Sequence, residues 1–293
     1  MARFGRVVTA MVTPFTDDLS LDIERAQEVA GWLVDHGSDG LVVTGSTGES
    51  ATLTDEEKVT MWRAVAEAVG DRATVIAGTG TYDTAHSIHL SDEAEKAGAD
   101  GLLIVTPYYN KPPQRGLIEH FTRIAGATDL PILAYNIPGR TGLRIEHDTI
   151  LRMAEVDNIV AVKDSTGDFD AIAHLVRAAP DGFEVYSGDD WATFGYVCLG
   201  ATGVVSVAGH VVGERIRQMI EQLEGGDLAS ARKLHYELMP VFDALFITSN
   251  PIPLKKAMEL IGQPVGPPRL PLVEANDDET ARIEVALKES GVL

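Results

Sequence analysis

An internal repeat is the feature that most restricts how this chain can fold. A glycine-bounded motif occurs three times, as GSDGLVV from Gly37, GADGLLIV from Gly98 and GATGVVSV from Gly200. In each copy the first glycine suits the left-handed residue that ends a helix, and a short apolar run follows the second. The copies begin 61 and 102 residues apart. These spacings correspond to two and about four units of roughly 25–30 residues, the size of a βα unit.

Other apolar runs complete an alternation of strands and helices. Strands are expected at Val7–Met11, Leu41–Val43, Thr74–Ala77, Leu102–Val105, Ile132–Ala134, Ile159–Val162, Phe183–Tyr186 and Val204–Val207. These runs are apolar throughout, as in parallel strands that are covered on both faces. Helical patterns lie between them, and Thr54–Val69 opens with the capping box Thr54-x-x-Glu57. The sequence therefore predicts an α/β fold, a (β/α)8 TIM barrel.

Only helical patterns follow the eighth strand. They lie near Val211–Glu224, Leu228–Leu245 and Pro253–Ile261, before a proline-rich stretch and a short acidic helix. We therefore divide the chain into a (β/α)8 catalytic barrel, residues 1–224, and a C-terminal helical region, residues 225–293.

Charge and cysteine content limit the partners and the compartment. The formal net charge of -20 repels phosphate backbones and anionic lipids, which argues against nucleic-acid and membrane partners. Cys198 is the single cysteine, so no internal disulfide or multi-cysteine zinc site can form. It lies in an apolar stretch and is expected to be a small buried residue. We expect a cytoplasmic protein.

Polar side chains gather where the predicted strands end. The segments that follow strands 2, 4, 5, 6 and 7 are GSTGES from Gly45, TPYYN from Thr106, YNIPGRTG from Tyr135, KDSTGD from Lys163 and SGDD from Ser187. Function in such barrels collects at the carboxyl ends of the strands. The sequence therefore predicts an active site at this mouth of the barrel.

Lys163 is the most informative residue of this set. It directly follows a buried strand, so its amine should be partly desolvated, with a lowered pKa and more of the free base that attacks carbonyls. An isolated lysine at a strand end is more often a snorkelling residue or the partner of an acid such as Asp164. The polar residues on the neighbouring loops favour the catalytic interpretation.

The other candidates each have a plainer alternative. The GSTGES turn can bind a carboxylate through its amides and hydroxyls, or be simply a glycine-rich turn. Tyr135 can move protons or be an amphipathic core residue, and Arg140 can bind a substrate carboxylate or form a surface ion pair. Asp189 and Asp190 can be acids or metal ligands, although such a pair more often caps the next helix. The eight histidines are scattered, so we expect no catalytic metal.

Taken together, the motifs resemble the dihydrodipicolinate synthase and N-acetylneuraminate lyase family. The likeness runs nearly end to end, from TAMVTPF near the start through GSTGES, VTPYYNKP, YNIPGRTG, AVKDSTGD, YSGDD and GVVSV to SNPIPLKKAMELIG from Ser249. The resemblance implies a homotetramer built as a dimer of dimers, and a covalent imine mechanism without a cofactor.

The resemblance also implies roles for particular residues. Lys163 would form the imine with pyruvate, with Tyr135, Ser46 and Tyr109 as further catalytic residues, Tyr109 reaching into a neighbouring subunit's site. The residues implied to bind substrate are Thr47, Arg140, Val205 and Gly188.

Within the family, the form IPGRTG resembles the synthases. That likeness implies condensation of pyruvate with L-aspartate 4-semialdehyde to 4-hydroxy-tetrahydrodipicolinate, on the route to diaminopimelate and lysine. The alternative is a class I aldolase that releases pyruvate from 2-keto-3-deoxy sugar acids or N-acetylneuraminate, among which the form GSTGE is common. A metal-dependent barrel enzyme and a barrel that only binds a small molecule are weaker alternatives.

Overall fold

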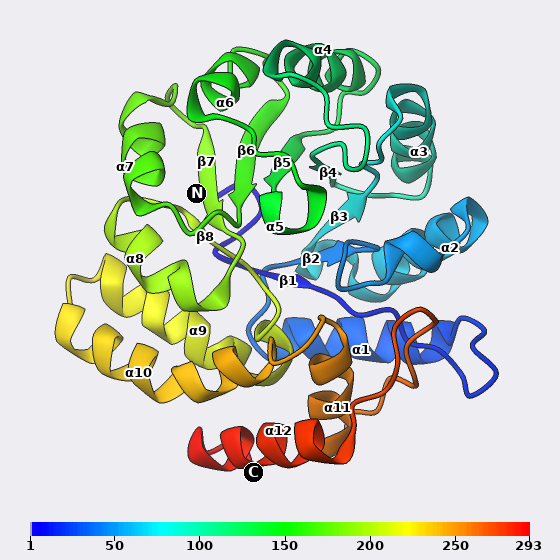
Figure 1. The fold of residues 1–293 in the computed structure, drawn as a ribbon, viewed down its shortest axis with the longest axis vertical. Helices are drawn as coiled ribbons and strands as arrows, with labels where there is room; N and C mark the ends of the chain where they lie inside the picture. The colour runs from blue at the N-terminus through cyan, green and yellow to red at the C-terminus, as the bar shows by residue number, and fades with distance from the viewer. Residues whose placement is uncertain (1) are drawn as a thin grey trace.

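Eight parallel strands close into a barrel in the computed structural model, which describes residues 2–293 (Figure 1). Each strand pairs with the next along the chain, and β8 pairs with β1. The strands are β1 (Val7–Ala10), β2 (Gly40–Val43), β3 (Thr74–Gly78), β4 (Gly101–Val105), β5 (Ile132–Asn136), β6 (Ile159–Asp164), β7 (Glu184–Ser187) and β8 (Gly203–Ser206). The predicted (β/α)8 barrel is confirmed.

Helices surround the barrel and cover the outer face of its strands (Figure 1). The α-helices are α1 (Ile23–Asp35), α2 (Asp55–Val69), α3 (Thr84–Lys96), α4 (Gln114–Ala125), α5 (Pro138–Thr141), α6 (His147–Met153), α7 (Phe169–Ala178), α8 (Thr193–Cys198), α9 (Gly209–Glu224), α10 (Leu228–Ala244), α11 (Ile252–Leu260) and α12 (Asp277–Glu289). Short 3₁₀ helices are η1 (Ser50–Thr52), η2 (Gly70–Arg72) and η3 (Asp190–Ala192). The predicted capping box is present in α2, where Thr54 and Glu57 each bind the other's backbone N–H.

Strands β5 and β6 are longer than the apolar runs that predicted them. They continue into polar residues because the ladder persists there, with Tyr135 opposite Lys163 and Asn136 opposite Asp164. The side-chain amide of Asn136 donates to the Asp164 carboxylate over 3.0 Å, which satisfies both buried groups. The two candidate catalytic side chains therefore project from regular strands and not from loops.

Side chains fill the inside of the barrel, and a second apolar layer lies between the strands and the helices. The interior set comprises Phe4, Val8, Ala10, Val42, Ile76, Leu103, Leu133, Tyr135, Ala161, Tyr186 and Val205. Burying each large aliphatic side chain contributes about 1.5–3 kcal/mol. The barrel is thus a packed core, and its residues near the carboxyl ends of the strands are held rigidly.

The C-terminal helices lie on one side of the barrel (Figure 1). Helix α10 packs against α9, and α12 packs against α10 and α11. The segment after α11 returns to the start of the chain, where the Phe15 amide donates to the Val265 carbonyl over 3.1 Å. The proposed boundary between residues 224 and 225 coincides with the end of α9.

The expectation for Cys198 was wrong. Its thiol side chain is exposed at the end of α8. This short helix buries Thr193 and Tyr196, so the position two residues further along faces solvent.

Among residues 2–293, no helix combines the length and the apolar character needed to cross a membrane.

Gly78 at the end of β3 provides a test of how tightly the mouth of the barrel is packed. A Cβ atom at this position would lie 2.5 Å from the Thr44 carbonyl oxygen, so Gly78→Ala should lower the free energy of unfolding by about 1–3 kcal/mol. Gly139→Ala is the matched control, because a Cβ atom there would meet no atom within 4 Å. Urea unfolding of both variants measures the difference. Equal free energies for the two would contradict this packing.

Candidate active site

Lys163 and Tyr135 are neighbours on adjacent strands at the mouth of the barrel. They pair directly in the register of β5 and β6, and each side chain is only 5% exposed. The Lys163 Nζ atom lies 4.2 Å from the centroid of the Tyr135 ring. The amine therefore lies over the ring of Tyr135, and both side chains are anchored on paired strands of the barrel.

Burial sets the protonation of both groups. It lowers the pKa of Lys163 to about 8, against the opposing charges of Asp189 and Asp190. The direction agrees with the expectation from the sequence. Burial also raises the pKa of Tyr135, which keeps its phenol protonated near neutral pH. The pair thus combines a partly free amine with a neutral proton donor.

Gly188 and Val205 lie around the lysine. A Cβ atom at Gly188 would stand 3.1 Å from Lys163 Cε and 2.0 Å from Ser165 Oγ, so only glycine leaves this space open. Val205, on β8, belongs to the same interior cluster as Tyr135. Ser165 Oγ is buried and has no hydrogen-bond partner within residues 2–293. It is a further polar group at this site, which the sequence analysis did not single out.

The two aspartates do not cap the next helix. Asp190 is buried and its carboxylate accepts from Ser206 Oγ and from the amides of Val207 and Ala208, over 3.1 and 2.9 Å. It thereby holds the turn that enters α9, not α8. Asp189 is partly buried, and burial raises the pKa of its carboxyl to about 6, while Lys163 opposes the rise.

A cavity of about 280 Å³ opens at the carboxyl ends of the strands. Its wall includes the side chains of Ser46, Tyr108, Tyr135 and Arg140, which come from four different segments of the barrel mouth. Lys163 does not line this cavity itself. Its amine lies against the ring of Tyr135, which does line the cavity. The volume suits small molecules of a few carbon atoms better than a large ligand.

The GSTGES turn contributes Ser46 to the wall of this cavity, whereas Thr47 does not line it. Ser46 is exposed in the cavity wall, and the amides of Ser46 and Thr47 donate to no acceptor within residues 2–293. The Thr47 hydroxyl is buried and accepts from Asn250 Nδ2 over 2.8 Å. Two free amides beside a hydroxyl form a suitable cradle for a carboxylate. The turn leads into the 3₁₀ helix η1 and not directly into an α-helix.

Arg140 lies in α5 and is part of the same cavity wall. It is exposed, and its Nη2 atom donates to the Asn250 carbonyl over 3.2 Å. Other guanidinium N–H groups remain available for a ligand. Asn250 therefore touches both Thr47 and Arg140, the two residues expected to bind carboxylates.

Tyr109 is not brought to the site of its own chain. Its side chain is 93% exposed, and its backbone has a left-handed φ of 68°. The neighbouring Tyr108 lines the cavity and packs edge-on against Tyr82, with ring centroids 5.3 Å apart. The two tyrosines therefore point to different places.

Residues of the C-terminal region complete the cavity, and no role was predicted for any of them from the sequence. Asn250, Pro271 and Leu272 are part of the wall. The motif SNPIPLKK around Asn250 contributed to the family resemblance, and that was the only signal pointing to it. Among residues 2–293, no group of three or more His, Cys, Asp or Glu side chains is arranged to hold a metal ion.

Comparison with known proteins agrees with this geometry. The sequence profile of the Dihydrodipicolinate synthetase family matches residues 3–290. The 4-hydroxy-tetrahydrodipicolinate synthase of Moorella thermoacetica is 55% identical over 291 residues, covering 99% of this chain and 100% of that protein.

Two solved structures show the same fold along the whole chain. The lysine-bound enzyme of Cyanidioschyzon merolae has a TM-score of 0.98 and 44% identity, with both chains covered completely. The dihydrodipicolinate synthase of Acinetobacter baumannii, solved with pyruvate, has a TM-score of 0.96 and 36% identity, covering 99% of this chain and 100% of that one. The chain belongs to the dihydrodipicolinate synthetase family.

Proposed function

We propose that this chain is a lyase that condenses pyruvate with L-aspartate 4-semialdehyde to give 4-hydroxy-tetrahydrodipicolinate, in the synthesis of diaminopimelate and lysine. One observation carries the proposal: the buried Lys163 amine, with its lowered pKa, lies beside Tyr135 and adjoins the cavity of the GSTGES turn. The name and near-complete coverage of the Moorella relative support the synthase rather than the pyruvate-releasing aldolase.

In this mechanism the Lys163 amine attacks the ketone of pyruvate and water leaves, which gives an imine. Loss of a proton from the methyl carbon gives an enamine, whose carbon attacks the aldehyde of the second substrate. The substrate amine then attacks the imine carbon, which closes the ring and frees Lys163. The amine itself activates the ketone, so the reaction needs no dissociable cofactor or metal.

The remaining site residues support these steps. We assign the pyruvate carboxylate to the free amides and hydroxyls of Ser46 and Thr47, beside Gly188 and Val205, which shape the pocket around the imine. Tyr135, with its raised pKa, donates and recovers protons during imine formation. Arg140 binds the carboxylate of the semialdehyde at the entrance.

Lys163→Arg should abolish covalent trapping and lower turnover by roughly a thousandfold or more, since a guanidinium does not form the imine. Borohydride treatment with pyruvate, followed by mass spectrometry, should place the adduct of the unaltered protein on Lys163. Because the free amine is the reactive form, the rate of trapping should rise with pH through about 8. An adduct on another lysine, or a rate that falls over this range, would sink the mechanism.

Arg140→Met should raise the KM for aspartate semialdehyde about tenfold to a hundredfold, because one charge-assisted hydrogen bond contributes about 1.5–3 kcal/mol. Pyruvate should still be trapped on Lys163, and this adduct serves as the control for folding. Parallel assays with aspartate semialdehyde and with a 2-keto-3-deoxy sugar acid test the choice of substrate. Faster turnover of the sugar acid would favour the aldolase.

We also propose that the chain forms a homotetramer in which Tyr109 completes the site of a neighbouring copy. Its 93% exposure and left-handed φ, at the tip of a loop beside the cavity, support this role. Subunits carrying Tyr109→Phe should regain activity when co-assembled with Lys163→Arg subunits, because each hybrid pair then contains one intact site. Hybrid oligomers as inactive as their parents would show that Tyr109 does not act across subunits.

A further inference from the structure

Two residues with an unusual backbone conformation lie at the ends of the GSTGES turn: Thr44 directly precedes it, and Glu49 is its fifth residue. Thr44 and Glu49, neither of them glycine, have left-handed φ values of 57° and 54°. Such a conformation is unfavourable for a side chain with a Cβ atom, and especially for a β-branched one. It persists only where surrounding contacts impose it. The shape of the turn therefore depends on what holds its two ends.

Elements of the barrel hold the first end. The indole N–H of Trp62 in α2 donates to the Thr44 hydroxyl over 2.7 Å, and both side chains are buried. The carbonyl of Gly78, at the end of β3, lies 3.4 Å from the same hydroxyl. These partners belong to units of the barrel that directly follow the turn along the chain.

Residues of the C-terminal region hold the second end. The Glu49 carboxylate lies 2.7 Å from Lys255 Nζ, and the two side chains are 0% and 4% exposed. The attraction is that of two charges and not of a well-aligned hydrogen bond. The other carboxylate oxygen accepts from the Arg269 amide over 2.8 Å, and Lys255 also donates to the carbonyls of Thr13 and Pro267.

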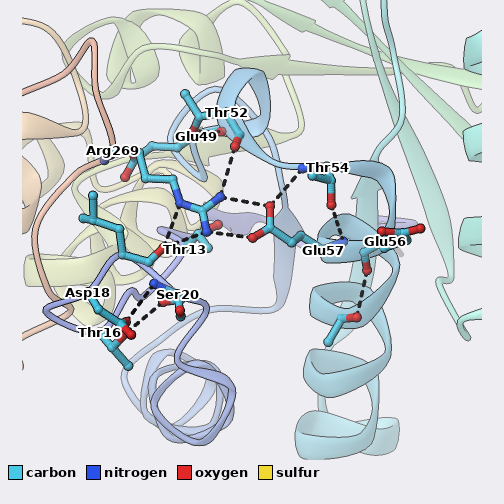
Figure 2. Close-up of polar contacts among 12 residues, drawn as sticks. Thr13, Thr16, Asp18, Ser20, Glu49, Thr52, Thr54, Glu56, Glu57 and Arg269 are labelled. Atoms are coloured by element: carbon cyan, nitrogen blue, oxygen red, sulfur yellow. Dashed lines mark hydrogen bonds and ion pairs between the residues drawn. The ribbon is translucent and has the colours of Figure 1, made fainter.

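Arg269 fixes the segment that carries this amide. Figure 2 shows its guanidinium between the carboxylate of Glu57 and the backbone of Thr52, and its bonds to Glu57 measure 2.7 and 2.9 Å. It also stacks on the Phe15 ring, 4.3 Å from the centroid. The same Glu57 forms the capping box of α2. The bonds between Arg269 and Glu57 therefore join the C-terminal segment to α2, the helix that follows the GSTGES turn.

We propose that Glu49 and Lys255 are a positioning pair for the condensation, holding the second end of the turn so that the Ser46 and Thr47 amides converge on one carboxylate. This inference rests on the proposed function, because it takes that carboxylate to be the one of pyruvate. Glu49 is part of the cavity wall, but its side chain is fully buried. The pair acts through the backbone of the turn.

Stability alone is a poor reason for such a pair. Moving two charges out of water costs much of what their attraction returns, and apolar side chains of similar volume often serve a protein interior as well or better. A buried pair placed against a strained turn that carries ligand-binding amides is better explained by the conformation it imposes. We therefore expect that removing the pair weakens pyruvate binding more than it lowers the free energy of unfolding.

The test is the double variant Glu49→Gln/Lys255→Met, which removes both charges and leaves neither buried alone. We expect the kcat/KM for pyruvate to fall at least tenfold, mainly through a higher KM, while the KM for aspartate semialdehyde stays unchanged. The matched control is Arg215→Met/Glu237→Gln, which removes an ion pair of 2.8 Å between α9 and α10, away from the cavity wall. It should leave both constants unchanged.

An unchanged KM for pyruvate in the folded double variant would overturn the inference and leave the pair a structural one. Should that variant fail to fold, Glu49→Asp decides the question, since it keeps the charge but shortens the reach to Lys255. A raised KM for pyruvate supports positioning, and an unchanged one overturns it. Borohydride trapping of pyruvate by the unaltered protein separates the two ideas, because its absence would refute the proposed function itself.

Discussion

The mechanism that we propose depends on keeping an amine out of water at the end of a strand. Lys163 continues the ladder of β6 and faces Tyr135 of β5, so its position is fixed by backbone hydrogen bonds and by the packed interior of the barrel. The same burial that orders the side chain lowers its pKa to about 8. Position and reactivity thus have one physical cause.

The mouth of the barrel is built from two kinds of support. The strands hold Lys163 and Tyr135, whereas the proposed substrate cradle lies on a turn whose backbone is strained at Thr44 and Glu49. A strained turn needs external contacts, and Asn250, which binds the Thr47 hydroxyl, supplies one of them. The C-terminal region therefore supports the proposed substrate cradle as well as covering one side of the barrel.

Much of the barrel could be predicted because the strands lie in mostly apolar runs that alternate with helical patterns, and three of these runs open with the same glycine-bounded motif. Lys163 and Tyr135 were recognisable for a related reason, since each directly follows such a run. Asn250 and Thr47 are 203 residues apart in the sequence and belong to different motifs, so no local pattern could predict their contact. The burial of Cys198 was predicted wrongly because an apolar neighbourhood does not specify which side of a short helix faces solvent.

The return of the C-terminal segment to the first turns has a consequence for biosynthesis. A ribosome delivers Ser46 and Thr47 early and Lys255 and Arg269 near the end, so a partly synthesised chain lacks the groups that contact Glu49. The groups that we propose to hold the second end of the GSTGES turn are thus synthesised after the turn itself. In a nascent chain, the turn would take its final shape only once the C-terminal segment has been made and has folded back onto it.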